Sequence, residues 1–128
     1  MKILGIGVDV IKNKRIKRLI NEKAFLQRTF GKNEIKFSIN YPNKMNYFAK
    51  RFAAKEAFAK SLGTGFRNNL NLKDIEILND NLGKPYYHMS QKIKNIVYKK
   101  FKIKKFDLFL SISDEKDYSV AFTILQIK

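Results

Sequence analysis

Two carboxylates, Asp9 and Glu56, lie in local sequences suited to holding a metal ion at a phosphate group. Asp9 ends the run GIGVD, in which Gly5 and Gly7 leave the same side of an alternating stretch almost free of side chains. Glu56 lies beside small alanines in RFAAKEAFAK. Two carboxylates, with phosphate oxygens and water completing the shell, are a common set of ligands for Mg²⁺. The pattern therefore predicts a magnesium-phosphate site, provided that the fold brings the two segments together.

Each of these residues also has an ordinary structural interpretation. Glu56 and Lys60 are four residues apart, and such a pair stabilises a helix by ~0.2–0.5 kcal/mol. By spacing alone this ion pair is the better interpretation. A strand face that carries only glycine, as at Gly5 and Gly7, marks a place where either a ligand or another backbone comes close.

The turn Gly63-Thr64-Gly65 follows the predicted helix rather than preceding it. In a P-loop the glycines precede a helix, and the phosphate binds at its positive N-terminus. Here the helix presents the negative end of its dipole. A phosphate at this turn would need cations such as Lys60 or Lys84, or exposed glycine amides. Taken by itself, the turn is a helix C-cap.

The elements that must position these residues follow from the periodicity of the apolar side chains. Alternation predicts strands, a spacing of three to four residues predicts helices, and Gly, Pro or Ser marks their ends. In the first half we expect a strand over 2–11, a helix from 13, short helices near 24–30 and 33–40, and a long helix over 43–62. A loop over 66–71 then leads to a strand over 74–78, a turn over 80–85 and a strand over 86–89. The chain ends with a helix from a Ser90 cap to 101 and a hairpin of strands over 106–113 and 118–127. These elements predict an α+β fold with an antiparallel sheet and one long helix, in a single compact domain over 1–128.

Composition and charge set further limits. The 128 residues carry a formal net charge of +16 and no cysteine, which excludes disulfides, thiolate metal sites and a thiol nucleophile. The apolar run at the N-terminus is too short to span a bilayer, so we expect a cytoplasmic protein that does not associate with the membrane. The charge is compatible with nucleic acid, with an acidic or phosphate-rich partner, or with a solvated surface. Charge alone does not choose among these.

Four segments, GIGVDVI, RFAAKEAFAKSLGTG, NDNLGKP and SISDEKDYSVA, together resemble the holo-acyl-carrier-protein synthase family, the small bacterial 4′-phosphopantetheinyl transferases. The resemblance extends from Gly5 to Ala121, with the segments in the family's order and at similar spacing. It implies the 4′-phosphopantetheinyl transferase fold. It also implies transfer of the phosphopantetheine arm of coenzyme A to a serine of apo-acyl carrier protein. This step of fatty acid biosynthesis needs Mg²⁺ and releases adenosine 3′,5′-bisphosphate.

The resemblance also assigns site residues by motif. Asp9 and Glu56 are expected to be the metal ligands, and Lys60 is expected to act with them in catalysis. The residues expected to bind coenzyme A are Lys60, Gly63, Thr64, Gly65, Gly83, Lys84 and Pro85. The basic first helix is expected to receive the acidic carrier protein through Arg15, with Lys14 and Arg18 in support.

The chemistry of these residues agrees with the implied reaction. A hydroxyl attacks the pyrophosphate link of coenzyme A, so charge builds on phosphate oxygens, which a metal ion and Lys60 would stabilise. The serine proton could pass to a metal-bound water or hydroxide, or to one of the two carboxylates, and the sequence leaves this choice open. Because the carrier protein supplies the nucleophile, the chain itself needs none.

Phe109 is a departure from the family, which usually has histidine at this strand position. Alternation places Phe109 on the polar face of its strand with Asp107, Ser111 and Ser113. Any polar contact that the histidine makes to coenzyme A would be lost here. The family is typically trimeric, with active sites between subunits, and the resemblance therefore implies a homotrimer.

A small basic RNA-binding protein is the main alternative, because the charge of +16 accompanies interleaved Tyr and Phe. The chain shows neither the aromatic strand pattern of an RNA-recognition motif nor a KH-type G-x-x-G clamp, so we expect no nucleic-acid partner. A family member that has lost activity and only binds the carrier is a second alternative. The retained Asp9, Glu56 and Lys60 argue against it.

Overall fold

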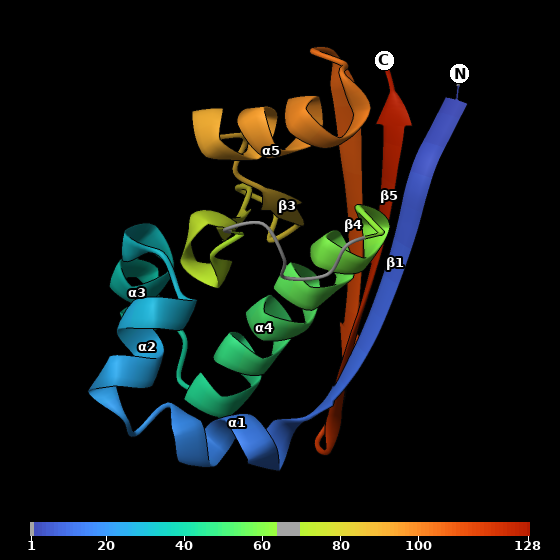
Figure 1. Cartoon of the computed structure of the whole chain (residues 1–128). Coiled ribbons are helices and arrows are strands. Elements are labelled where there is room, and N and C mark those ends of the chain that lie inside the picture. Colours follow the sequence, from blue (N-terminus) through green and yellow to red (C-terminus); the bar gives the residue numbers. More distant parts are fainter. Residues whose placement is uncertain (1, 64–69) are drawn as a thin grey trace.

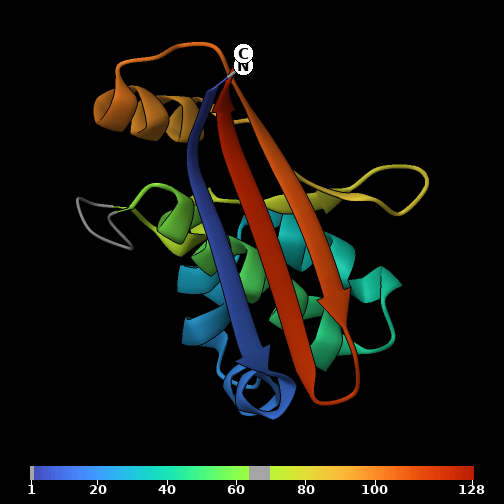
Figure 2. The same ribbon diagram turned by 90° about the vertical axis from the view of Figure 1, so that its right-hand side faces the viewer.

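The computed structural model describes residues 2–63 and 70–128. Within them, β1 (Lys2–Lys12), β4 (Phe106–Asp114) and β5 (Tyr118–Ile127) form a three-stranded antiparallel sheet in the order β1-β5-β4. Figure 2 shows this sheet from its open face, with helices behind it. β1 and β4 are therefore the two edge strands of the sheet. The predicted antiparallel sheet and its C-terminal hairpin are confirmed.

One long helix, α4 (Lys44–Ser61), lies across the inner face of the sheet (Figure 1). Its N-terminus is capped by Asn43, whose side chain accepts a hydrogen bond from the N–H of Asn46 at 3.1 Å. Gly63 follows its C-terminus with a φ of +79°, a left-handed conformation that favours glycine. The helix predicted over 43–62 and the role of Gly63 as its stop are confirmed.

The glycines of β1 allow its backbone to lie against the backbone of α4. A Cβ atom at Gly7 would stand 1.8 Å from the carbonyl oxygen of Ala57, and one at Gly5 would stand 1.8 Å from that of Ser61. Of the two interpretations of this glycine face, the approach of another backbone is confirmed. The expectation that the glycines leave room for a ligand beside Asp9 is wrong, because the helix fills that room.

The outer face of the sheet is apolar and exposed. Its large exposed side chains are Ile3, Ile6, Val8, Val10, Phe109, Tyr118, Val120 and Phe122. The placement of Phe109 on the exposed face of β4 is confirmed. The pairing of β1 with β5 is irregular between Ile3 and Gly5, which turns Leu4 toward the core and Ile3 outward. Strict alternation of β1 would put Leu4 on the face of Ile6, Val8 and Val10 and Ile3 on the face of Gly5, and that prediction is wrong at these two residues.

Shorter helical segments surround α4. They are α1 (Asn13–Leu19), α2 (Lys23–Thr29), α3 (Lys32–Phe37), the 3₁₀ turn η1 (Ser38–Asn40) and α5 (Gln91–Phe101). α5 begins at Ser90 as predicted, because the Ser90 hydroxyl accepts a hydrogen bond from the N–H of Ile93 at 3.2 Å. α1 packs against α4 and β1. In the described part of the chain, no helix combines the length and apolar character needed to cross a bilayer.

A buried ion pair joins α4 to α3, and its lysine also contacts the segment that follows α4. Lys55 and Glu34 are completely buried, and the Lys55 ammonium lies 2.5 Å from Oε1 of Glu34. The same ammonium donates hydrogen bonds to the backbone carbonyls of Leu72 and Ile75. Together with the hydrogen bond from the N–H of Ile77 to Oε2 of Glu34 at 3.0 Å, these contacts hold the segment against α3 and α4.

The second sheet is short. Residues Leu72–Asp74 form the 3₁₀ turn η2, and β2 (Ile77–Asn79) pairs only with β3 (Pro85–Tyr87). The strand predicted over 74–78 is therefore wrong at its start. The loop predicted over 66–71 lies mostly outside the described residues.

Candidate active site

The structure brings Asp9 of β1 close to Glu56 of α4. Both side chains are half-buried, and burial raises the pKa of each carboxyl above its ordinary value. The negative charge of Asp9 raises the pKa of Glu56 further, which shows that the two groups lie within electrostatic reach of each other. The predicted convergence of these two segments is therefore seen in the fold.

Lys60 completes this cluster from the next turn of α4. Its ammonium donates hydrogen bonds to the backbone carbonyl of Val8 at 3.0 Å and to Oδ1 of Asp9 at 3.2 Å. The ordinary helix pair between Glu56 and Lys60 is wrong, since the ion pair that Lys60 makes within the described residues joins it to Asp9. The close packing of β1 on α4 places the Asp9 carboxylate within reach of this lysine.

The donor set of the cluster fits a magnesium ion that is shared with a substrate. Mg²⁺ typically keeps several waters and binds to proteins through one or two carboxylates together with substrate phosphates. Asp9 and Glu56 supply two carboxylates at a partly exposed position. Over residues 2–63 and 70–128, no group of three or more His, Cys, Asp or Glu side chains could hold a metal by itself. The cluster therefore suits a metal whose remaining ligands come from water and phosphate.

The basic first helix contributes to the electrostatics of the same cluster. Arg15 on α1 lowers the pKa of both Asp9 and Glu56 through its positive charge, although burial outweighs this effect. Arg15 is exposed, as are Lys14 and Arg18. The residues expected to receive the carrier protein thus form an exposed basic helix beside the carboxylate pair.

Among the other residues expected to bind coenzyme A, Gly63 follows Lys60 at the end of α4, where its N–H donates to the Lys60 carbonyl at 3.0 Å, whereas three residues lie away from this cluster. Gly83, Lys84 and Pro85 belong to the β2–β3 hairpin, which packs beside β4 at the far edge of the sheet (Figure 2). Gly83 and Pro85 line a small cavity of about 150 Å³ together with Ile112 and Asp114 of β4. Thr64 and Gly65 lie outside the described residues.

Gly83 of the β2–β3 hairpin lies in a turn with left-handed backbone, a conformation that glycine adopts without strain. Gly83 has a φ of +87°, and the carboxylate of Asp80 accepts hydrogen bonds from the N–H groups of Leu82 at 2.9 Å and Lys84 at 2.8 Å. The side chain of Lys84 is exposed. The turn therefore fixes the backbone around Gly83 and leaves the Lys84 ammonium free to reach a ligand.

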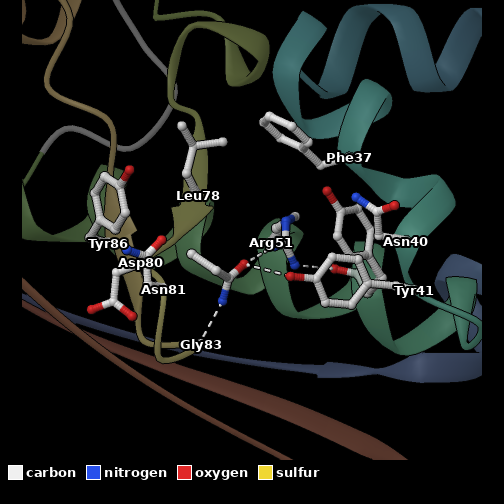
Figure 3. Close-up of a pocket in the computed structure, with 11 residues that line it drawn as sticks. Phe37, Asn40, Tyr41, Arg51, Leu78, Asp80, Asn81, Gly83 and Tyr86 are labelled. Atoms are coloured by element: carbon white, nitrogen blue, oxygen red, sulfur yellow. Dashed lines mark hydrogen bonds between the residues drawn. The ribbon is translucent and has the colours of Figure 1, made fainter.

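A cavity of about 510 Å³ opens between this hairpin, α4 and the segment around η1 (Figure 3). Its wall is made of Phe37, Asn40, Tyr41, Tyr47, Arg51, Leu78, Asn79, Asp80, Asn81, Gly83 and Tyr86. The volume falls within the ~300–1,000 Å³ that is usual for a ligand pocket. Aromatic rings and amide groups dominate this wall.

Arg51 supplies the positive charge of the cavity, whose wall also includes the acidic residue Asp80. The residue is only 4% exposed, and its guanidinium stacks on Tyr47 with 3.6 Å between its central carbon and the ring centroid. It donates hydrogen bonds to Oδ1 of Asn79 and, at 3.2 Å, to the carbonyl of Tyr47. Its Nε is buried without a partner in the described part of the chain. A positive group held in an aromatic setting is suited to an anionic, ring-containing ligand.

Sequence reasoning missed Arg51 as a functional residue. A signal was present, because Arg51 and Lys55 are four apart in RFAAKEAFAK and so lie on one side of the helix. That side is buried, and the two cations have different surroundings. Lys55 is neutralised by Glu34, whereas Arg51 faces a cavity.

Comparison with known proteins identifies relatives of this chain along almost its whole length. Residues 5–123 match the model of the 4′-phosphopantetheinyl transferase superfamily. A holo-[acyl-carrier-protein] synthase of Pelagibacter ubique is 56% identical over 128 residues, covering 100% of both chains.

Two solved structures share the fold. The crystal structure of holo-[acyl-carrier-protein] synthase from Neisseria meningitidis has a TM-score of 0.84 and 38% identity, covering 97% of this chain and 98% of the other. A holo-(acyl-carrier-protein) synthase from Bacillus anthracis, in complex with CoA (3′,5′-ADP), has a TM-score of 0.82 and 32% identity, covering 100% of both chains. The predicted fold class is confirmed by these similarities.

Proposed function

This chain belongs to the 4′-phosphopantetheinyl transferase superfamily, and we propose that it is a magnesium-dependent holo-[acyl-carrier-protein] synthase whose metal ion is held by Asp9 and Glu56. It transfers the 4′-phosphopantetheine arm of coenzyme A to a serine of apo-acyl carrier protein and releases adenosine 3′,5′-bisphosphate. The observation that carries the proposed metal site is the meeting of two half-buried carboxylates with Lys60 at an exposed edge of the fold.

The proposed site supplies what phosphoryl transfer from coenzyme A requires. The carrier serine attacks the phosphorus atom that bears the pantetheine arm, and the bond to the leaving adenosine bisphosphate breaks. Charge then develops on the phosphate oxygens, which a bound Mg²⁺ would neutralise. Lys60 projects from the same edge, and its ammonium can donate to these oxygens. Asp9 and Glu56 fix where the reacting phosphates lie relative to α4.

The cavity beside Arg51 is the proposed place for the nucleotide end of coenzyme A. Adenosine 3′-phosphate combines an aromatic ring with a negatively charged group. Tyr41, Tyr47 and Tyr86 offer surfaces on which adenine can stack, and the positive charge of the Arg51 guanidinium favours a phosphate in the cavity. Gly83, which is expected to bind coenzyme A, lines this cavity.

The two parts of the proposed site lie at opposite edges of the sheet in one chain. Asp9 is on β1, the Gly83 hairpin lies beside β4, and α4 fills the inner face between them. We therefore propose that the β1 edge of one subunit meets the β4 edge of the next, so that one coenzyme A contacts both.

The assembly that we propose is the homotrimer expected from the sequence. Edge-to-edge contacts of this kind run head to tail, and they close into a ring when the rotation between subunits permits. The exposed apolar outer face of the sheet, which includes Val8, Val10 and Phe122, supports a large interface between copies. Phe109 also lies on this face. An apolar residue at this position, where the family usually has histidine, fits a buried interface.

Acidic acyl carrier protein is proposed to dock on α1. Lys14, Arg15 and Arg18 give this helix an exposed positive surface, and complementary charge directs an acidic partner to it. Arg15 acts electrostatically on both carboxylates. A carrier bound there would bring its serine toward the proposed metal site. The cytoplasm expected from the sequence remains the proposed compartment.

Metal dependence can be tested by measuring transfer rates after divalent ions have been removed with a chelator and Mg²⁺ has been added back. We expect no transfer without the metal and full recovery with it. Asp74→Ala is a matched control, because Asp74 pairs with an exposed lysine at 2.9 Å, as Asp9 does at 3.2 Å, but far from the site. Asp9→Ala should lose transfer at all Mg²⁺ concentrations, whereas Asp74→Ala should not.

A further inference from the structure

The Lys60 ammonium occupies an oxygen of Asp9 that the proposed function assigns to the metal. We propose that Lys60 is a place-holding cation, which pairs with Asp9 in the metal-free protein and is released toward substrate phosphate when Mg²⁺ binds. This inference rests on the proposed function, because it requires that Asp9 is a metal ligand. It assigns Lys60 two alternative partners, Asp9 and a phosphate group.

A cation is needed between the carboxylates even without a metal. Asp9 and Glu56 are partly withdrawn from water and repel each other when both are ionised. Lys60 is the group that contacts Asp9 directly, with its ammonium 3.2 Å from the Oδ1 atom. Arg15 acts on both carboxylates through its charge. Lys60 is therefore the cation that a metal must displace from Asp9.

The contacts of Lys60 are weak enough to be exchanged. Its side chain is 54% exposed, and it is held by one carboxylate oxygen and by the carbonyl of Val8. Ion pairs of such exposure contribute little to stability. Lys55, one turn earlier on α4, shows the contrast, because its ammonium is completely buried and satisfied by a carboxylate and two carbonyls. The contacts of Lys60 therefore allow it to change partners, whereas those of Lys55 hold it in place.

Exchange at Asp9 would couple metal binding to phosphate recognition. Before the metal binds, the Lys60 ammonium is engaged with Asp9 and is less available to a phosphate. After exchange, the same ammonium remains next to the site with its charge unpaired. Coupling of this kind is reciprocal, so coenzyme A phosphates that attract Lys60 would also favour the metal. Lys60 thereby acts as a positioning residue for metal loading in addition to its contact with phosphate.

Calorimetric titration of Mg²⁺ into metal-free protein, without coenzyme A or carrier, tests this exchange. Lys60→Met removes the competing cation, and we expect Mg²⁺ to bind about two- to five-fold more tightly than to the wild type. Lys60→Arg retains a cation that can pair with Asp9, so it should bind like the wild type. Arg15→Met is the matched control, because it removes one positive charge near both carboxylates without removing the contact to Asp9. The gain in Mg²⁺ affinity should be clearly smaller in Arg15→Met than in Lys60→Met.

The outcomes separate this inference from the proposed function. Equal Mg²⁺ affinity in the wild type and Lys60→Met, or weaker affinity in the variant, would overturn the exchange while leaving the metal site intact. Equal gains in Mg²⁺ affinity in Lys60→Met and Arg15→Met would show that only the overall charge matters. That result would also overturn the proposed exchange. No Mg²⁺ binding by any of the proteins, either in this titration or in one repeated with coenzyme A present, would refute the metal site itself. A thermal melt of each variant establishes that it is folded.

Discussion

Gly7 of β1 and Ala57 of α4 lie in such close contact that a Cβ atom at position 7 would stand 1.8 Å from the Ala57 carbonyl oxygen. The atom would meet fixed helix backbone, so the clash could be relieved only by moving α4 away from the sheet. Because α4 carries Glu56 and β1 carries Asp9, this one contact sets the separation of the two carboxylates.

Gly7→Ala should therefore destabilise the fold by about 1–3 kcal/mol or more, the usual cost of overfilling a packed interior. Urea unfolding measures this loss, and Mg²⁺ affinity should fall with it. Gly63→Ala is the control, because among the described residues no atom beyond its chain neighbours lies within 4 Å of the added Cβ, and its φ of +79° opposes the change. It should cost about 1 kcal/mol. Equal, small costs at both glycines would contradict the packing argument.

Glu56→Gln should stabilise the metal-free protein at neutral pH. Burial and the Asp9 charge raise the pKa of Glu56 above its ordinary value of 4.5. The folded state therefore binds this proton more tightly than the unfolded state does, and stability falls as the pH rises from 4.5 through the raised pKa. The free energy of unfolding, measured against pH with a chelator present, should fall less steeply in Glu56→Gln than in the wild type. Parallel curves would show that Glu56 is not strained by its surroundings.

Arg15→Glu should raise the KM for apo-acyl carrier protein by about ten-fold or more, since it replaces an attractive charge with a repulsive one. The KM for coenzyme A should change less, because α1 is proposed to contact the carrier protein, whereas the nucleotide is proposed to bind beside Arg51. Steady-state rates with each substrate varied in turn measure both constants. Lys100→Glu, an exposed charge reversal on α5, is the control. Equal increases in the two KM values would refute docking on α1.

Two inactive variants should restore activity when they are combined in one oligomer. Glu56→Ala removes the proposed metal ligand, and Arg51→Met removes the cation of the nucleotide cavity. If each site is built from two subunits, mixed trimers contain some sites with both parts intact, about a quarter for random mixing. Co-unfolding and refolding the two variants together should regain activity, whereas mixing them after separate refolding should not. No recovery in refolded mixtures would place the whole site within one chain.

The sequence predicted the elements well where local rules decide the structure. Caps at Asn43 and Ser90 set the starts of α4 and α5, and alternation placed Phe109 on the correct face of β4. Prediction was wrong where distant contacts decide. The strand predicted over 74–78 begins later, in a segment held by Lys55 and Glu34, and no local pattern reveals those contacts.

The candidate site was predicted only in part, because some of its features also depend on contacts between distant segments. Asp9, Glu56 and Lys60 were identified from their motifs, and the fold brings them together. The spacing of Glu56 and Lys60 suggested the wrong ion pair. Lys60 instead contacts Asp9 on β1, and this carboxylate cannot be inferred from helix spacing. Arg51 was missed because its role depends on a cavity formed with the distant β2–β3 hairpin.

The mass of the carrier protein after reaction tests the central claim most directly. Apo-acyl carrier protein, coenzyme A and Mg²⁺ are incubated with the wild type, Asp9→Ala, Glu56→Ala and the control Asp74→Ala, and intact carrier is weighed by mass spectrometry. We expect the wild type and Asp74→Ala to add one phosphopantetheine arm, and the two site variants to be slowed at least about 10²-fold, with no more than partial rescue by extra Mg²⁺. An unchanged carrier mass with wild-type protein, under conditions where a known transferase modifies the same carrier, would contradict the account.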